Sequence, residues 1–275
     1  MDKPWLELAN DPSLDLALLQ EARKPPHGVT YEVVPARGSN WKMPRYQREF
    51  RTAIVRLSDR VSMIERPTMG LALATELATT EPASAIPREM GVSVPGTITV
   101  ADVTWGKEVF TCISAYVVWQ TVLSDAKSPW IIADASAHRI ISDISTLIAH
   151  RDRHRIIVAG DWNLMFGYGE FGLEYWAGRY KTVFDRMKAL GLRFVGPQAP
   201  NGRKAEPWPE ELPKDSLNVP TFHSTKQKPA TAARQIDYVF ASERIADRVS
   251  VRALNEVAEW GPSDHCRVVI EVEGP

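Results

Sequence analysis

Four short segments of the chain join an apolar, strand-like run to side chains that can do acid-base or metal chemistry. They are DLALLQE ending in Glu21, RIIVAGDWN with Asp161 and Asn163, QIDYVF with Asp237, and GPSDHC with Asp264 and His265. Carboxylates are hard oxygen ligands for Mg²⁺ and can act as general bases, and an imidazole can donate to a phosphate oxygen. Together, these residue types suit metal-assisted hydrolysis of a phosphoester.

Each segment taken alone also has a purely structural interpretation. The Gly-Asp-x-Asn sequence at Asp161 is typical of a hydrogen-bonded Asx turn. Asp237 could face solvent on a half-exposed strand, and Glu21 could simply be the polar end of a buried strand. The Pro-Ser-Asp sequence before His265 suits an ordinary turn. Single segments therefore leave the choice open, and their joint occurrence in this order favours a functional site.

In this order the four segments resemble the endonuclease/exonuclease/phosphatase superfamily. Its members include abasic-site endonucleases, DNase I-like nucleases, sphingomyelinases and inositol-polyphosphate phosphatases. The resemblance covers roughly residues 15 to 272, with FRTAIVRL and ISAYVVW resembling weaker intermediate blocks. It implies an α/β (α+β) fold, a four-layer sandwich in which two mixed β-sheets lie face to face with helices outside.

The resemblance also implies a metal site. Glu21 would be the main ligand of Mg²⁺, with Mn²⁺ as an alternative, and Asp264 would be a second or water-mediated ligand. Mg²⁺ keeps several waters, so one or two carboxylates plus a substrate phosphate suffice. No Cys or His cluster has zinc spacing, which argues against zinc.

The same resemblance assigns roles at the reacting phosphate. Asp161 would be the general base on water, and Asn163 would orient the phosphate or the nucleophile. His265 would contact a phosphate oxygen, while Asp237 accepts from its other ring nitrogen. Tyr116 in ISAYVVW matches a tyrosine that some members place near the scissile phosphate, although a core tyrosine with a satisfied hydroxyl is the alternative. Thr221 in NVPTFH falls at a weaker family block.

One family feature is missing from the sequence. Members usually begin with a strand ending in Asn, whose side chain contributes to the metal and phosphate site. PWLELANDPSLDLALLQE instead resembles the helix and strand that follow it, and Asn10 before an Asp-Pro turn is a poor substitute. We therefore expect the sandwich to lack the usual first strand and to leave a neighbouring strand with unpaired backbone groups.

A basic and aromatic segment is the best candidate for substrate contact. From Arg37 to Arg51 the chain carries five Lys or Arg residues, interleaved with Trp41, Tyr46 and Phe50 and opposed only by Glu49. Such a segment suits phosphate contact plus base stacking, although a solvated loop is the alternative. The candidate substrate-binding residues are Arg45, Arg48, Trp41 and Asn163.

Composition limits the class of protein. With 275 residues, 44% of them hydrophobic, the chain can bury a large core, and we expect one domain over 1–275. The net charge of -1 means that any nucleic-acid contact must be local.

The two cysteines, Cys112 and Cys266, are too few for a disulfide framework and suit buried thiols. Without a leader-like start or a run of about 18 apolar residues, we expect a cytoplasmic protein with no membrane contact. No obligate protein partner is evident.

Short apolar runs and turn signals predict the elements. Strands are expected at 15–19, 31–34, 52–57, 98–103, 109–118, 155–159, 192–195, 236–240, 249–253 and 267–272. Trp105-Gly106-Lys107 joins two of them as a hairpin. Helical periodicity is present over 140–148 and 180–190, whereas 196–234 has no clear periodicity and suits a functional loop.

The expected function is a divalent-metal-dependent phosphodiester hydrolase. A nuclease acting on DNA or RNA is favoured because no membrane-binding segment is visible. A phosphatase or phosphodiesterase acting on a small or lipid phosphate is the first alternative. A catalytically weak binding protein of the same fold is the second.

Overall fold

The computed structural model describes residues 3–8, 11–43, 49–80, 89–119 and 128–274. All ten expected strands form within one to three residues of their predicted bounds. They are β1 (Leu16–Ala22), β2 (Glu32–Val34), β3 (Arg51–Arg56), β7 (Ile98–Trp105), β8 (Glu108–Tyr116), β9 (Ile156–Asp161), β10 (Leu192–Gly196), β11 (Asp237–Ser242), β12 (Val249–Leu254) and β13 (Arg267–Val272). The two periodic segments lie in or at the end of α3 (Pro129–Ser145) and α4 (Glu174–Ala189).

Several elements were not predicted from the sequence. They are α1 (Lys3–Leu8), β4 (Val61–Arg66), β5 (Thr68–Gly70), α2 (Leu71–Thr80) and β6 (Met90–Val92). Strand β4 has regular alternation in burial, but one of its outward positions is Ile64, whose residue surface is 69% exposed. An apolar residue on the solvent side hides the alternation of apolar and polar residues by which a half-buried strand is recognised.

A six-stranded mixed sheet forms the centre of the molecule, in the order β10-β11-β9-β8-β7-β4. Strands β8 and β9 run parallel, and the other neighbours run antiparallel. The expected hairpin joins β7 to β8, with Trp105 paired to Glu108 and Gly106 at a φ of 60°. The left-handed region costs glycine little, which suits it to this tight turn.

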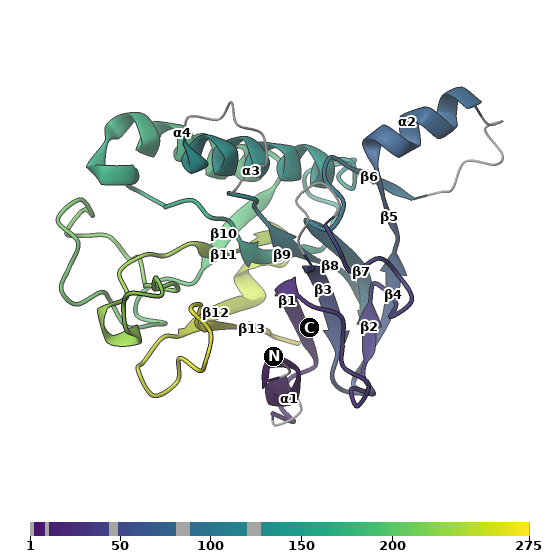
Figure 1. Cartoon of the computed structure of the whole chain (residues 1–275), viewed down its shortest axis with the longest axis horizontal. Coiled ribbons are helices and arrows are strands. Elements are labelled where there is room, and N and C mark those ends of the chain that lie inside the picture. Colours follow the sequence, from purple (N-terminus) through teal and green to yellow (C-terminus); the bar gives the residue numbers. More distant parts are fainter. Residues whose placement is uncertain (1–2, 9–10, 44–48, 81–88, 120–127, 275) are drawn as a thin grey trace.

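The layers follow from the way each face of this sheet is covered (Figure 1). Helices α3 and α4 cover the outer face with residues such as Ile140 and Tyr180. The inner face packs on two smaller sheets, β1-β3-β2 and β12-β13, through residues such as Ile54 and Val251. Helix α1 covers the far side of the three-stranded sheet with Trp5. This arrangement of helices, sheet, sheet and helix is the expected four-layer α+β sandwich.

Strands β1 and β13 of the inner layer each form a ladder on one side only, in the described part of the chain. In the described residues, β1 has one neighbouring strand, β3, and β13 has one, β12. Both strands contribute to the same core, Leu18 from β1 and Ile270 from β13, and both of these side chains are only partly buried. Helix α1, not a strand, precedes β1 in the described part of the chain.

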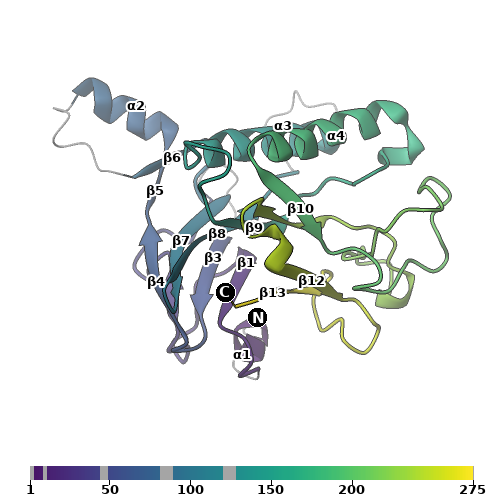
Figure 2. The ribbon, with the colours of Figure 1, turned by 180° about the vertical axis from the view of Figure 1, so that it is seen from behind.

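Helix α2 projects from the sandwich beside the two short parallel strands β5 and β6, of which β6 packs into the core through Val92 (Figures 1 and 2). Its described side chains are largely exposed, including Leu71 and Leu73. None of the helices in the described part of the chain is long and apolar enough to cross a membrane. The two cysteines, Cys112 and Cys266, are free and buried, as expected.

Candidate active site

Three of the candidate side chains occupy one row across the six-stranded sheet. Tyr116 on β8 is the cross-strand partner of Asp161 on β9, and Asp161 is in turn the partner of Asp237 on β11. Partners directly across a ladder point to the same face. Alternation along β9 and β11 puts Asp161 and Asp237 on the inner face, with Ala159 and Val239. The row therefore faces the second sheet layer.

Gly160 is what lets β8 and β9 approach at this row. A Cβ atom at this position would lie 1.9 Å from the backbone oxygen of Ala115 on the neighbouring parallel strand. Any side chain would push the two strands apart. The glycine of the GDWN segment thus allows the close pairing of β8 and β9 next to Asp161.

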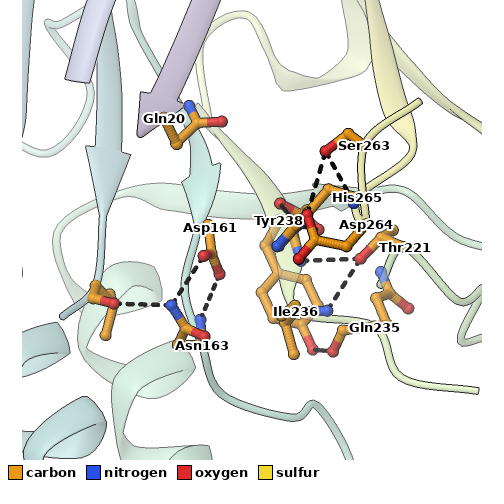
Figure 3. Close-up of polar contacts among 12 residues, drawn as sticks. Gln20, Asp161, Asn163, Thr221, Gln235, Ile236, Tyr238, Ser263, Asp264 and His265 are labelled. Atoms are coloured by element: carbon orange, nitrogen blue, oxygen red, sulfur yellow. Dashed lines mark hydrogen bonds and ion pairs between the residues drawn. The ribbon is translucent and has the colours of Figure 1, made fainter. Parts of the chain in front are cut away.

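Asp161 and Asn163 form the Asx turn that was the structural interpretation of this sequence (Figure 3). The backbone N–H of Asn163 donates to Asp161 Oδ1 at 2.9 Å, and Asn163 Nδ2 donates to Asp161 Oδ2 at 2.8 Å. Nδ2 also donates to the Val117 carbonyl at 2.9 Å. The turn and a catalytic role are compatible, because the turn holds the carboxylate in one orientation. It also uses both N–H groups of the Asn163 amide.

Burial raises the pKa of Asp161 to about 8. The positive charge of His265 and the hydrogen bond from Asn163 oppose this shift, while the neighbouring carboxylates of Asp237 and Glu21 add to it. A carboxyl group titrating near neutral pH is a stronger base than an ordinary aspartate, which is the property that general-base catalysis requires.

His265 and Asp237 form a hydrogen-bonded pair. Nδ1 of His265 lies 2.9 Å from Asp237 Oδ2 and 3.1 Å from Oδ1. Burial of the ring lowers its pKa, but the carboxylates of Asp237, Asp161 and Asp264 outweigh that effect and raise the pKa of His265 to about 10. Asp237 is buried, which excludes the solvent-facing alternative for this residue.

Two residues outside the main segments hold this pair in place. Thr221 is fully buried, and its Oγ1 accepts from the backbone N–H groups of Ile236 and Asp237. Phe222 forms isolated antiparallel β-bridges with Arg234 and with His265, and the centroid of its ring lies 5.0 Å from that of the imidazole. In the sequence, Thr221 stands out only because NVPTFH weakly resembles a segment of the superfamily. Its role depends on a contact between segments that no local pattern reveals.

Glu21 reaches the site from the other sheet layer. Its backbone has a φ of 49° at an irregularity in the pairing of β1 with β3, between Leu19 and Ala22. The left-handed region costs a non-glycine residue about 1 to 2 kcal/mol, and such strain is common where a side chain must be re-aimed. Tyr116, itself buried, donates from its hydroxyl to Glu21 Oε1 at 2.7 Å. Tyr116 is thus a core tyrosine with a satisfied hydroxyl, as the alternative expected, and its hydroxyl partner is the candidate metal ligand Glu21.

The donor set suits a hard divalent cation. Glu21 and Asp264 are both exposed, and each lies close enough to affect the pKa of a site residue, Asp161 and His265 respectively. Among the described residues, no group of three or more His, Cys, Asp or Glu could hold a metal ion. Mg²⁺ needs only one or two carboxylates when water and phosphate complete its shell, so these oxygens fit it.

The candidate substrate segment is only partly described. Arg45 and Arg48 lie outside the described residues. Trp41 is buried, and its ring lies 6.4 Å from that of Trp5 in α1. Only 5% of the surface of Trp41 is exposed, so a nucleobase cannot stack on its ring. Base stacking in this segment therefore cannot rest on Trp41 in this conformation.

Comparison with known proteins bears on the fold. No family model matches the chain, and no curated protein matches it significantly in sequence. Solved structures do match over almost its whole length. The endonuclease domain of TRAS1, a telomere-specific non-LTR retrotransposon, is 15% identical with a TM-score of 0.55, over 98% of this chain and 91% of that one. An AP endonuclease from Archaeoglobus fulgidus is 17% identical with a TM-score of 0.55, over 98% and 92%.

A third similar structure is the 3′-5′ exonuclease NExo from Neisseria meningitidis. It is 16% identical with a TM-score of 0.54, over 99% of this chain and 94% of that one. NExo from Neisseria is also described as a 3′ phosphatase, bound to a product DNA hairpin. The chain has the DNase I-like fold. The motif resemblance is thereby confirmed for the architecture.

Within this DNase I-like fold the four motif segments converge from both sheet layers. Asp161 and Asp237 belong to the six-stranded sheet, Glu21 belongs to the three-stranded sheet, and His265 lies two residues before the start of β13. Figure 3 shows Asp161 with Asn163 on one side of the site and Asp264 with His265 on the other. Residues far apart in the sequence thus form one polar group.

Proposed function

We propose that this chain is a divalent-metal-dependent phosphodiester hydrolase acting on DNA or RNA. The observation that carries the proposal is the hydrogen-bonded pair of His265 and Asp237. Asp161 lies beside this pair as the cross-strand partner of Asp237. An imidazole held by one carboxylate and adjacent to a second, high-pKa carboxylate supplies a proton acceptor and a positive hydrogen-bond donor together.

Asp161 is the proposed general base. It takes the proton from the attacking water, and its raised pKa makes that transfer favourable near neutral pH. Asn163 acts as a positioning residue for Asp161, because its two donor groups are already used by Asp161 and Val117. The remaining polar atom of its side chain is the amide oxygen, which can accept from the water but cannot donate to a phosphate.

His265 is the proposed phosphate contact. Its Nδ1 faces Asp237, and no hydrogen bond in the described residues uses Nε2, which leaves this atom to donate to a non-bridging oxygen. The carboxylates around the ring keep it protonated at neutral pH, so that it adds positive charge where the transition state gains negative charge.

Glu21 is the proposed main metal ligand, with Asp264 second. Tyr116 fixes one carboxylate oxygen of Glu21, and no hydrogen bond within the described residues uses the other. Bound Mg²⁺ or Mn²⁺ would supply Lewis acidity and charge neutralisation at the phosphate. Both carboxylates are exposed, so the cation can arrive with its waters and with the substrate.

Nucleic acid is favoured as the substrate on two grounds. The similar structures include an AP endonuclease, a telomere-specific endonuclease and a 3′-5′ exonuclease. The segment from 37 to 51 is rich in basic and aromatic residues. The description of NExo as a 3′ phosphatase supports a second candidate, removal of a terminal phosphate.

A substrate panel tests the proposal. Single- and double-stranded DNA, RNA, a small phosphodiester and phosphomonoesters would be incubated with Mg²⁺, Mn²⁺ or chelator, and products would be resolved by length and by released phosphate. Cleavage of DNA or RNA that chelator abolishes is the expected result. Phosphate release alone would favour the phosphatase, and binding without turnover would favour the binding protein.

A further inference from the structure

Trp119 is the one exposed tryptophan of the chain. The sequence contains nine tryptophans, and all nine lie in the described residues. Trp119 is 40% exposed, whereas Trp5, Trp41, Trp162, Trp176 and Trp260 are buried and the remaining three are half-buried. A tryptophan has more apolar surface to bury than almost any other residue, so exposure at a single position calls for a local reason.

Its position in the fold gives that reason, because Trp119 directly follows the segment that holds the candidate site together. Tyr116, three residues earlier, bonds to Glu21, and the carbonyl of Val117 accepts from Asn163. The backbone N–H of Val118 donates to Ser136 Oγ in α3 at 3.0 Å. Three successive residues before Trp119 are thus fixed by hydrogen bonds. The backbone that precedes Trp119 is therefore anchored to groups of the candidate site and to α3.

The ring itself has no aromatic or cationic neighbour in the part of the chain that the structure describes. Several other described tryptophans pack against rings, such as Trp162 with Phe240 and Trp130 with Phe171. A free indole face on an anchored backbone is a stacking platform, and nucleobases stack on such faces in many proteins that bind single strands.

We propose that Trp119 binds the nucleobase next to the scissile phosphate. This inference rests on the proposed function and names a substrate feature for it, a planar base on the nucleotide at the reacting centre. Stacking tolerates any base, so Trp119 favours nucleotides over phosphates that lack a ring without selecting one sequence. The anchoring of residues 116 to 118 sets the distance between this base and the catalytic groups.

The test compares binding of two short oligomers in Mg²⁺. One is a nuclease-resistant phosphorothioate oligonucleotide, and the other has the same backbone without bases. Trp119→Ala should raise the Kd for the base-containing oligomer by about 5- to 150-fold, the range for loss of one base–aromatic stack, and should reduce the preference for it. Trp119→Phe should retain most of the preference. Tyr175→Ala, which removes a 63% exposed aromatic on α4, is the matched control and should change nothing.

The outcomes separate this inference from the proposed function. If the wild-type protein hydrolyses a small phosphodiester but Trp119→Ala leaves the preference for bases intact, the inference is wrong and the hydrolase stands. Equal weakening of both oligomers would also overturn it, since Trp119 would then act on the backbone or on folding. If the wild type neither hydrolyses phosphodiesters nor binds either oligomer, both proposals fail.

Discussion

Asp161 on β9 and Asp237 on β11 are direct cross-strand partners, so two carboxyl groups share one face of the central sheet at adjacent positions. Like charges at this spacing repel, and the carboxylate of Asp237 adds to the rise in the pKa of Asp161 that burial causes. His265, hydrogen-bonded to Asp237, offsets that repulsion with its positive charge. The three side chains therefore act as one electrostatic unit.

The unit predicts non-additive effects on turnover. Asp237→Asn and His265→Gln should each reduce kcat, and the double variant should lose little more than the worse single variant, because residues that act together lose their function together. Steady-state rates of the four proteins with Mg²⁺ measure this directly. Losses that multiply would mean that the two residues act independently.

Metal affinity should depend on Tyr116. Its hydroxyl fixes one oxygen of Glu21, and loss of a partner that orients a metal ligand typically costs 10- to 100-fold in affinity. Tyr116→Phe should therefore raise the Kd for Mn²⁺ by about that factor, measured calorimetrically without substrate, and Glu21→Gln should raise it at least as much. Tyr175→Phe serves as a control for loss of a tyrosine hydroxyl. Unchanged affinity in Tyr116→Phe would contradict the orienting role of Tyr116, and unchanged affinity in Glu21→Gln would contradict Glu21 as the main ligand.

The metal-free protein should lose stability as the pH rises through the range of His265. Its pKa is raised from 6.5 to about 10 in the folded state, so the folded protein binds this proton more tightly than the unfolded chain. The resulting stabilisation is complete below pH 6.5 and is lost between 6.5 and 10. Melting temperatures in chelator should fall over this window. Below pH 8 the loss of a proton from Asp161, whose pKa is raised to about 8, adds to the fall, and above pH 8 the fall is due to His265. Asp237→Asn should flatten the fall, and an equally steep fall in that variant would contradict the assigned cause.

Much of the fold followed from local patterns. Strands β9 and β11 are short apolar runs bounded by turns, and the helical face of α4 repeats at the spacing of one turn. The grouping of Asp161, Asp237 and His265 was expected only because the four segments, in their order, resemble a known superfamily. Each of these signals lies within a few consecutive residues, which is why the sequence alone carried them.

The remaining features depend on contacts between distant segments. The bond from Tyr116 to Glu21 spans 95 residues, and nothing near either residue indicates it. Trp41 belongs to an aromatic-rich segment that suggested base stacking, but Trp5 of α1 packs against it. Ile64 faces solvent and obscured β4. In each case tertiary packing, which no local pattern contains, decides the outcome.

Strands β1 and β13 each pair with one strand only in the described residues, so we expect an added strand to pair with one of them. Leu18 and Ile270 at these edges are only partly buried, so a strand added there would cover apolar surface and supply ladder hydrogen bonds. A form extended upstream of α1 by an apolar strand ending in Asn should melt at least ~2 °C higher, the shift expected for about 1 kcal/mol. It should also bind metal more tightly. The same extension with a proline in mid-strand is the control. Equal melting temperatures and metal affinities for the extended form and the present chain would refute the prediction.

The most direct test of the account is cleavage of an oligonucleotide by the wild type, Asp161→Asn and Asp185→Asn in Mg²⁺ and in chelator. Asp185 is an exposed aspartate on α4, so its variant controls for loss of a carboxylate. We predict cleavage by the wild type and Asp185→Asn only with metal, and a loss of ~10² or more in kcat for Asp161→Asn with little change in melting temperature. Full activity in chelator, or equal turnover in Asp161→Asn, would contradict the proposed site.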